Sequence, residues 1–372
     1  MQGRHPQFFR KMIRKPERSL RRGEPVFVRD RDGKPVGVGF YNSRSELALR
    51  MLSRHPVDDI PKLLRARLDE ACDLRERVLN LPATTDGYRL VHAEGDGLPG
   101  LVLDRLGDTI VAQIFAQCAM EHIETIGERL LERYPGCRLV LTLDKESASR
   151  EGIDPLPPPR ARSTTVTEHA ILYQVQPGTG HKTGFFADQR DNRLRVSQLS
   201  AGRRVLDLCC NSGGFAMAAH RGGATDVVAV DLDEKTVAQA RANAECNQMR
   251  IRVEQGDAFA TLRNTEPGRH DMIVLDPPKW ALGKAALDEA LVKYADLNHL
   301  ALTKLARGGI LVTCSCSGIL SESRFHAVLA QAAAKAGRDA RILHAGGAGP
   351  DHPIALECPE TRYLKAVFLE IR

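Results

Sequence analysis

The sequence predicts an α/β protein in which residues 165 to 372 form a seven-stranded, mostly parallel sheet with helices on both faces. Beyond residue 200, short apolar runs alternate regularly with helix-like segments, and this alternation is typical of a parallel sheet. In front of that region, β-rich runs separated by turn signals fill residues 25 to 53. These runs indicate a separate, smaller β module.

Three domains are expected, because 372 residues are too many for one ordinary core. Residues 1 to 68 are predicted as the small β-rich module, in which the Asp32-Gly33 step signals a hairpin. Residues 75 to 155 are predicted as an α+β middle domain. The segment DPLPPPRARSTT contains three consecutive prolines, which favour an extended connector. The third domain, residues 165 to 372, follows it.

The seven predicted strands of the third domain are buried-type runs. They are RRVLDL (203–208), DVVAVD (226–231), IRVEQGD (251–257), MIVLDPP (272–278), GGILVTCSCS (308–317), ARILHA (340–345) and YLKAVFLEI (363–371). Helices are predicted at 234–247, in a long segment that ends at Ala306, and from Ser321 to Ala336. No helix-like segment separates the last two strands, so the final strand is predicted to be antiparallel.

Composition excludes several classes of protein. Hydrophobic residues make up 42% of the chain and charged residues 27%, and no apolar run approaches the length of a membrane span. The first fifteen residues lack the apolar stretch of a secretory signal, so the cytoplasm is the expected location. The nine cysteines include no CxxC pair and are odd in number. Neither a disulfide framework nor a metal site is therefore expected.

Positive charge is concentrated at the N-terminus. Residues 1 to 60 hold 14 Lys and Arg against 7 Asp and Glu, whereas the other 312 residues hold 39 against 40. Clustered Lys and Arg on a small module favour contact with a polyanion, because neutralising phosphates releases condensed counterions. A solvated basic face explains the composition equally well.

Acidic side chains close four successive predicted strands, and they indicate a cofactor site. In sheets of this kind, ligands bind outside the carboxyl ends of the strands. The four acids are Asp207, Asp231, Asp257 and Asp276. Asp231 can accept hydrogen bonds from a ribose diol. The alternative, that Asp207 and Asp231 only cap helices or turns, requires the same coincidence at all four strand ends.

The loop LCCNSGGF after the first strand favours S-adenosylmethionine over a nicotinamide cofactor. In this loop, Gly213 and Gly214 let the backbone approach a ligand at a helix start. The loop lacks GxGxxG and leaves little room for a pyrophosphate. Asp207 would repel a diphosphate, but its charge suits the cationic amino acid end of S-adenosylmethionine.

Five sequence blocks resemble the bacterial RlmI-type 23S rRNA cytosine-5 methyltransferases, and the resemblance covers nearly the whole chain. The blocks are AEGDGLPGLVLDRLGD (93–108), HKTGFFADQRDNR (181–193), LDLCCNSGGF (206–215), DPPKW (276–280) and SCSG (315–318). The resemblance implies a PUA domain, a middle α+β domain and a class I methyltransferase domain, in this order. It also implies that the PUA module is short by about fifteen residues at its N-terminus.

The resemblance further implies a cofactor pocket, a substrate and partners. The cofactor is S-adenosylmethionine, and the substrate is RNA, with 23S rRNA as the expected molecule. No membrane partner is expected, and a homodimer is a possible assembly. A hairpin bearing Phe185, Phe186, Asp188, Gln189 and Arg190 is expected to close over the pocket. The expected cofactor-binding residues are Phe186, Gln189, Asp207, Asn211, Gly213, Asp231, Asp257 and Asp276.

Cys316 and Asp276 are the predicted catalytic residues. Carbon 5 of cytosine becomes nucleophilic when a thiolate adds to carbon 6, so this chemistry needs a cysteine near the base. The spacing of Cys316 from Gly309 matches the nucleophile of RNA cytosine-5 methyltransferases. Cys314 lies two residues away and would point to the same side of a strand, so spacing alone favours Cys316. Asp276 can hydrogen-bond a cytosine that has left its stack.

Two other functions fit the same motifs. DPPKW, with Trp280 as a stacking ring, also serves methylation of a base nitrogen, which needs no covalent step. An RNA-binding protein that holds the cofactor without turnover is the third reading. Lys279 stands where many relatives with two cysteines carry a second thiol used in product release. The base that releases the product is therefore another group.

Overall fold

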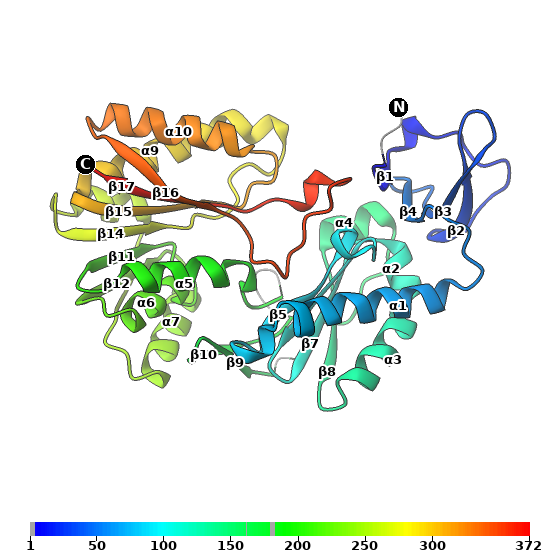
Figure 1. The fold of residues 1–372 in the computed structure, drawn as a ribbon, viewed down its shortest axis with the longest axis horizontal. Helices are drawn as coiled ribbons and strands as arrows, with labels where there is room; N and C mark the ends of the chain where they lie inside the picture. Colours follow the sequence, from blue (N-terminus) through cyan, green and yellow to red (C-terminus); the bar gives the residue numbers. More distant parts are fainter. Residues whose placement is uncertain (1–3, 161, 179–182) are drawn as a thin grey trace. The chain divides into compact units, whose positions relative to one another are not determined.

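The computed structural model describes residues 4–160, 162–178 and 183–372, and it divides into two compact units (Figure 1). Unit 1 comprises residues 1–168, 175–187 and 350–361. Unit 2 comprises residues 169–174, 188–349 and 362–372. Segment 350–361 is far along the sequence, yet it packs in unit 1, where the backbone N–H of Arg89 donates to Asp351 Oδ2 at 2.9 Å.

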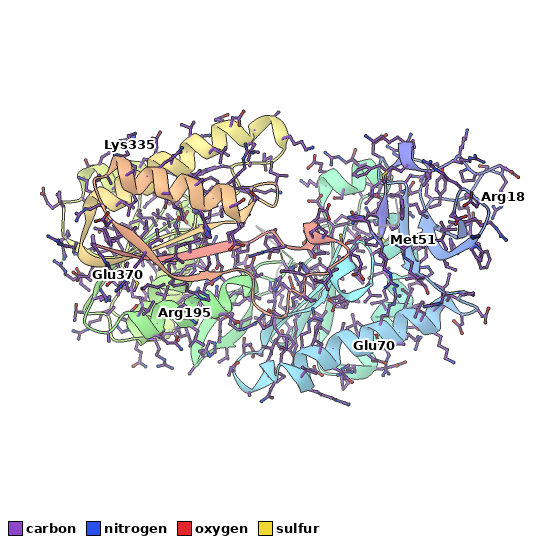
Figure 2. The ribbon with its side chains drawn as sticks, turned by 45° about the horizontal axis from the view of Figure 1, so that its top comes forward. Arg18, Met51, Glu70, Arg195, Lys335 and Glu370 are labelled. Carbon is purple, nitrogen blue, oxygen red and sulfur yellow. The ribbon has the colours of Figure 1, made fainter. Side chains whose placement is uncertain are left out.

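The N-terminal part of unit 1 is a small antiparallel sheet with strand order β1-β4-β3-β2. Its strands are β1 (Gln7–Phe8), β2 (Glu24–Arg29), β3 (Pro35–Tyr41) and β4 (Leu49–Ser53). The predicted hairpin joins β2 to β3, and Gly33 adopts φ +79° in the turn. Met51 on β4 is buried, whereas Arg18, which precedes β2, is exposed (Figure 2).

The rest of unit 1 is an α+β layer built on a four-stranded sheet with order β5-β6-β7-β8. The strands are β5 (Gly87–His92), β6 (Leu101–Leu106), β7 (Thr109–Ile114) and β8 (Arg138–Leu143); the helices are α1 (Ile60–Asp73), α2 (Gln117–Glu121), α3 (Ile123–Arg133) and α4 (Lys145–Glu151). Asp59 caps α1 by accepting from the N–H of Lys62. Helix α1 continues as a π-helical turn at Leu74–Val78. Strands β9 (Thr164–Glu168) and β10 (Ile171–Val175) lie where the chain passes between the units.

Unit 2 contains the predicted seven-stranded sheet, with order β13-β12-β11-β14-β15-β17-β16. The strands are β11 (Arg204–Leu208), β12 (Asp226–Asp231), β13 (Arg252–Gln255), β14 (His270–Leu275), β15 (Leu305–Ser315), β16 (Ala340–Gly346) and β17 (Lys365–Ile371). All pairs are parallel except those of β17, which runs antiparallel to β15 and β16. The mostly parallel α/β fold and the antiparallel last strand are confirmed.

Helices cover both faces of this sheet (Figure 1). They are α5 (Arg190–Leu199), α6 (Gly214–Arg221), α7 (Glu234–Cys246), α8 (Ala258–Asn264), α9 (Leu287–Lys304) and α10 (Glu322–Lys335). One core contains buried residues of α9 and α10, and a second contains buried residues of α5, α6 and α7. Within the described residues, none of the helices combines the length and hydropathy that a membrane span needs.

The predicted hairpin over the pocket is wrong. Residues Ala187–Gln189 form a 3₁₀ turn that leads directly into helix α5, so Asp188, Gln189 and Arg190 lie at a helix start. No β-branched residue occurs between Ala187 and Arg195, and Val196 buries its side chain in the sheet core from this helix. The segment therefore has a helical rather than a strand-like sequence. His181 and Lys182 of the same block lie outside the described residues.

Candidate functional site

The strand order places a switch point between β11 and β14. From β11 the chain proceeds outward to β12 and β13, and it then returns to add β14 on the other side. Side chains that follow β11 and β14 therefore flank the crevice where ligands of such sheets bind. Asp207 lies at the end of β11, and Asp276 directly follows β14.

The loop between β11 and α6 has an unusual backbone. Cys209, Asn211 and Gly213 all adopt left-handed conformations, with φ of 59°, 48° and 84°. This conformation costs little for glycine and for asparagine, but it is uncommon for cysteine. Such residues persist where the surrounding structure fixes them, and they cluster at ligand sites. Gly213 is the N-cap of α6, so the N-terminus of this helix faces the crevice edge.

Asp207 is fully buried beside this helix start. Its Oδ2 accepts the N–H of Ala216 at 2.9 Å. Its Oδ1 is buried and has no donor within the described part of the chain. Burial raises the pKa of Asp207 well above its usual range. A buried carboxyl oxygen without a donor is costly, and a cationic ligand group near the loop would offset that cost.

Asp231 and Asp257 have different surroundings. Asp231 is half-buried at the end of β12 and accepts the N–H of Asn211 at 2.8 Å, so it ties the loop to the neighbouring strand. Asp257 is exposed, and its Oδ1 accepts the N–H of Ala260 at 2.9 Å as the N-cap of α8. One carboxyl oxygen of Asp257 therefore serves to cap a helix.

Asp276 is oriented by a chain of amide side chains. Gln189 donates from Nε2 to Asp276 Oδ2 at 3.0 Å. Asn192, one turn further along α5, donates from Nδ2 to Gln189 Oε1 at 2.6 Å and to the carbonyl of Gly347 at 2.9 Å. Gln189 therefore orients the Asp276 carboxylate by hydrogen bonding to it. Asn192 is a contributor that the sequence pattern did not single out.

Burial separates the two candidate cysteines. Cys314 is fully buried within strand β15 and packs in the core beneath α5, α6 and α7. Burial raises the pKa of the Cys314 thiol well above its ordinary value, so this thiol stays protonated. Cys316 lies one residue beyond the strand and is half-buried. Of these two thiols, only Cys316 combines access with a position at the carboxyl edge of the sheet.

The turn that carries Cys316 is fixed by the buried Tyr294 of α9. Ser315 Oγ donates to the Tyr294 hydroxyl at 2.9 Å, and Ser317 Oγ lies 3.3 Å from the same oxygen. The backbone N–H of Ala281 donates to Ser317 Oγ. Trp280 packs on Tyr294, with ring centroids 4.8 Å apart. The residues on both sides of Cys316 are therefore immobilised, and one face of the Trp280 ring is engaged in packing.

Phe186 is half-buried and belongs to unit 1, whereas the other predicted cofactor-binding and catalytic residues belong to unit 2.

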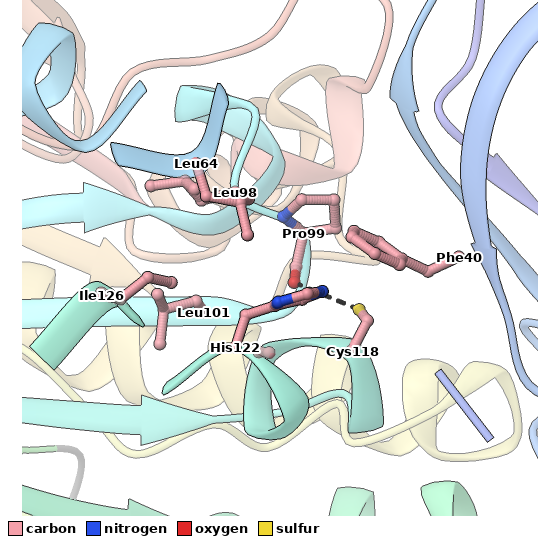
Figure 3. A pocket seen from close by; sticks show the side chains of 9 residues that line it. Phe40, Leu64, Leu98, Pro99, Leu101, Cys118, His122 and Ile126 are labelled. Atoms are coloured by element: carbon pink, nitrogen blue, oxygen red, sulfur yellow. Dashed lines mark hydrogen bonds between the residues drawn. The ribbon is translucent and has the colours of Figure 1, made fainter. Parts of the chain in front are cut away.

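Unit 1 has a small apolar cavity of about 10 Å³, lined by residues of β3, α1, β6, α2 and α3 (Figure 3). In it, the Cys118 thiol donates to the carbonyl of Pro99 at 3.7 Å. This volume suits at most one water molecule, so the cavity cannot hold a cofactor.

The described residues also contain one group with converging metal-ligand atoms. His5, Cys358 and Glu360, all in unit 1, have ligand atoms within 4.8 Å of one another. Glu360 Oε2 lies 3.1 Å from His5 Nε2, and it accepts from the Cys358 thiol at 3.6 Å. These hydrogen bonds account for the convergence of the three side chains.

A family model described as S-adenosylmethionine-dependent methyltransferase matches residues 153–340, and a PUA-like domain model matches residues 1–54. The protein named Ribosomal RNA large subunit methyltransferase I from Aeromonas salmonicida is 38% identical, over 99% of this chain and 96% of its own length. The protein of the same name from Tolumonas auensis is 37% identical, over 98% and 94%. The chain belongs to this family of S-adenosylmethionine-dependent methyltransferases.

Solved structures share the whole fold of this methyltransferase. The crystal structure of the methyltransferase SMU.776 complexed with SAH has a TM-score of 0.82 at 20% identity, and it covers 99% of this chain and 96% of that chain. A SAM-dependent methyltransferase from Streptococcus mutans has a TM-score of 0.79 at 19% identity, with coverage of 95% and 93%. At these identities the likeness concerns the fold. The predicted class I methyltransferase fold and the PUA-like module are confirmed.

The residues around the switch point fit S-adenosylmethionine. Asp207 offers a buried oxygen that has no donor among residues 4–160, 162–178 and 183–372. The left-handed loop brings its backbone to the crevice edge, and Asp231 carries a half-buried carboxylate. These groups could hold the amino acid end and the ribose of the cofactor. The assignment of single residues to parts of the cofactor is a prediction that binding measurements can test.

Replacing Asp231 with asparagine should weaken cofactor binding about tenfold or more, because hydrogen bonds to a charged acceptor contribute about 1.5–3 kcal/mol. Asparagine keeps one acceptor oxygen, which can serve the N–H of Asn211 and hold the loop, and it gives up the weaker contact with the exposed N–H of Asp233. The affinity for S-adenosylhomocysteine can be measured by titration calorimetry. Asp233→Asn, at the exposed N-cap of α7, is the matched control and should bind normally. Equal losses in both variants would argue against a cofactor contact at Asp231.

Proposed function

We propose that this methyltransferase converts a cytosine of large-subunit rRNA to 5-methylcytosine through a covalent adduct with Cys316. The observation that carries the proposal is the position of this thiol. In the parallel pair of β14 and β15, Leu275 is level with Thr313. Asp276 and Cys316 therefore both follow the carboxyl ends of adjacent strands, and a flipped base between them could contact both groups.

Cys316 would act as the nucleophile. Its thiolate adds to carbon 6 of the cytosine and makes carbon 5 electron-rich. Bound S-adenosylmethionine supplies the methyl group that carbon 5 takes up. A base then removes the proton from carbon 5, the bond between carbon 6 and sulfur breaks, and the electron pair returns to Cys316 as a thiolate. The rigid turn between Ser315 and Ser317 supports this role, because attack requires a fixed sulfur position.

Asp276 would bind and orient the base. One of its carboxylate oxygens accepts from Gln189, and the carboxylate can also accept from the exocyclic amine of a cytosine. Pro277 and Pro278 limit the backbone freedom of the segment after it. A carboxylate that is already held in place loses little conformational entropy when it binds the base.

An RNA substrate is supported by the names of the relatives, by the PUA-like module and by charge. In unit 1, three arginines and two acids, with neighbouring residues of α2 and the connector, line an open hollow of about 700 Å³, and the arginines Arg21, Arg22 and Arg44 outnumber the acids Glu121 and Asp154. Arg22 donates to the carbonyl of Gly152 at 2.5 Å, which orients one of these side chains. Clustered guanidinium groups bind phosphates bidentately. We therefore propose this hollow as a contact for the RNA backbone.

Methylation of a base nitrogen is the competing chemistry, and it requires a different role for Trp280. That chemistry stacks an aromatic ring on the base beside the DPP segment. The packing of Trp280 against Tyr294 at 4.8 Å and against Phe259 at 6.3 Å favours a core role for this ring. Access of Cys316 in the same region favours the covalent route.

The product nucleoside decides between the two. Large-subunit rRNA from a strain that lacks this enzyme is incubated with the protein and methyl-labelled S-adenosylmethionine, digested, and analysed by mass spectrometry. We expect the label in 5-methylcytidine. RNA containing 5-fluorocytidine should also form a complex that survives denaturing electrophoresis, since fluorine blocks proton removal. Label on another nucleoside, with no trapped complex, would contradict the proposal.

A further inference from the structure

We propose that Lys365 is a positioning residue for Cys316, whose thiol proton its amine accepts. This inference rests on the proposed covalent function and names the group that would make the nucleophile reactive. Lys365 is the first residue of β17, 49 residues after Cys316 in the sequence. The antiparallel register of β17 on β15 pairs Lys365 with Ser315, the residue directly before Cys316.

The Lys365 side chain is buried and lies against the Cys316 turn. It is only 4% exposed, which is rare for lysine unless a partner or function requires it. Its Nζ donates to the carbonyl of Ser317 at 2.6 Å and to the carbonyl of Tyr363 at 2.8 Å. Lys365 thus contacts the backbone on one side of Cys316 and pairs with the residue on the other side.

Two carbonyl partners suit a neutral amine. A neutral lysine has two N–H donors and one lone pair, and an ammonium has three donors. With both donors used by Ser317 and Tyr363, the lone pair remains available to accept a proton. Within the described residues, Lys365 forms no ion pair with a carboxylate. Such a pair would have fixed the ammonium form.

The surroundings make the neutral amine accessible near neutral pH, because a fraction of Lys365 is then unprotonated and can accept the thiol proton. Burial lowers the pKa of Lys365 to about 8, and Cys316 is the largest influence in the opposite direction. The other charged groups that act on the amine are Arg362, Glu322 and Lys279. Arg362 and Lys279 disfavour the ammonium, whereas Glu322 favours it. A thiolate at Cys316 stabilises the ammonium form of Lys365. By the same attraction, the Lys365 ammonium stabilises the Cys316 thiolate.

The proposed step moves one proton. The S–H bond of Cys316 breaks and an N–H bond forms on Lys365, which gives a thiolate and an ammonium. The third N–H of the ammonium then supplies a donor toward the turn. When the bond between carbon 6 and sulfur breaks, the thiolate is released beside the Lys365 ammonium, which has kept its proton. Since the carbon 5 proton goes to a separate base, Lys365 is not required to exchange protons with solvent in each cycle.

Alkylation of Cys316 by iodoacetamide tests this inference in the full-length protein. Rates are measured from pH 6 to 10 by peptide mass spectrometry, because only the thiolate reacts. Lys365→Gln keeps a donor for the backbone carbonyls and removes the positive charge. We expect the pH midpoint of Cys316 alkylation to rise by about one unit or more, so that the rate at pH 7 falls about tenfold. Lys365→Arg should restore part of the lower midpoint, since it restores the charge.

Controls separate this effect from unfolding. Cys246, which is exposed on α7, provides an internal reference in every sample and should react equally in all variants. Lys335→Met, at the exposed end of α10, should leave the midpoint unchanged. Thermal unfolding and cofactor binding show whether Lys365→Gln is folded. If that variant does not fold, two other measurements test the inference. They are the pH midpoint of Cys316 alkylation in Lys365→Arg and the pH profile of kcat for the unmodified enzyme.

The outcomes also distinguish this inference from the proposed function. If Cys316→Ala retains methyl transfer, Cys316 is not the nucleophile, and the proposed role of Lys365 fails with that assignment. If Cys316→Ala is inactive but folded Lys365→Gln shows an unchanged alkylation midpoint, the inference about Lys365 fails alone. A raised midpoint, with the kcat profile shifted in the same direction, supports both.

Discussion

Replacing Cys316 with alanine should abolish methyl transfer, lowering the rate about a thousandfold or more, while cofactor affinity stays within about twofold. The sulfur is the proposed covalent nucleophile, and without it carbon 5 of cytosine is unreactive. Single-turnover transfer from labelled S-adenosylmethionine to rRNA measures the rate, and calorimetry with S-adenosylhomocysteine measures the affinity. Because Cys316 is half-buried at the end of a strand, removing its sulfur should cost little stability.

Cys314→Ala is the matched control, because it removes the same atom two residues away. Cys314 is fully buried in the core, so its loss should lower the free energy of unfolding by about 1 kcal/mol and leave most of the methyl transfer. Activity in Cys316→Ala together with inactivity in folded Cys314→Ala would reverse the assignment. Activity in both would leave methylation of a base nitrogen as the remaining chemistry. Inactivity of the unmodified protein on every rRNA tested, with normal cofactor binding, would support the binding protein without turnover.

The inner strands of the unit 2 sheet were predictable because they are buried on both faces, whereas the edge strands β13 and β16 are largely exposed. Runs such as RVLDL and DVVAVD are short and rich in β-branched residues, and helix-like segments separate them. The strand boundaries therefore agree with the structure to within a few residues, as at β12 (Asp226–Asp231). Asp207, Asp231 and Asp276 were visible for the same reason, since each interrupts an apolar run, whereas Asp257 follows the polar residues Glu254 and Gln255.

The local structure around the site was less predictable. Helix α5 begins in a polar segment whose only strong signal was its resemblance to a family block, and the hairpin expected there is a helix. The alternation of a strand puts Cys314 and Cys316 on one side, so only the spacing from Gly309 favoured Cys316. The strand ends at Ser315, so only the first of the two lies within it. A strand end is among the least certain features that a sequence pattern gives.

Contacts between residues distant in sequence were not predictable at all. Tyr294 fixes the Cys316 turn from helix α9, and Lys365 reaches it from β17. Neither residue belongs to a motif. Segment 350–361 likewise follows β16 in the sequence but packs in unit 1. In each case the tertiary fold brings together residues that are far apart in the sequence. The local periodicity of a segment carries no information about such contacts.

Replacing Arg75 with methionine should destabilise unit 1 by about 3–5 kcal/mol, because it leaves a buried carboxylate without its partner. The Arg75 side chain is completely buried, and its Nη1 and Nη2 donate to the two carboxylate oxygens of Asp96 at 2.6 and 2.8 Å. The same guanidinium donates to the carbonyls of Arg89 and Asp351, and it thereby joins the π-helical turn after α1 to β5 and to segment 350–361. Methionine fills part of the volume but supplies none of these donors.

Denaturant unfolding can locate this effect, since the single tryptophan of the chain, Trp280, lies in unit 2. Tryptophan fluorescence follows unit 2, and far-ultraviolet circular dichroism follows both units. In Arg75→Met we expect a transition seen by circular dichroism to move to lower denaturant, with the fluorescence transition little changed. Arg77→Met is the control, because the Arg77 side chain is 77% exposed and its 3.4 Å pair with Asp73 contributes little. Equal shifts in the two variants would mean that the buried Arg75 cluster does not stabilise unit 1 more than an ordinary surface pair.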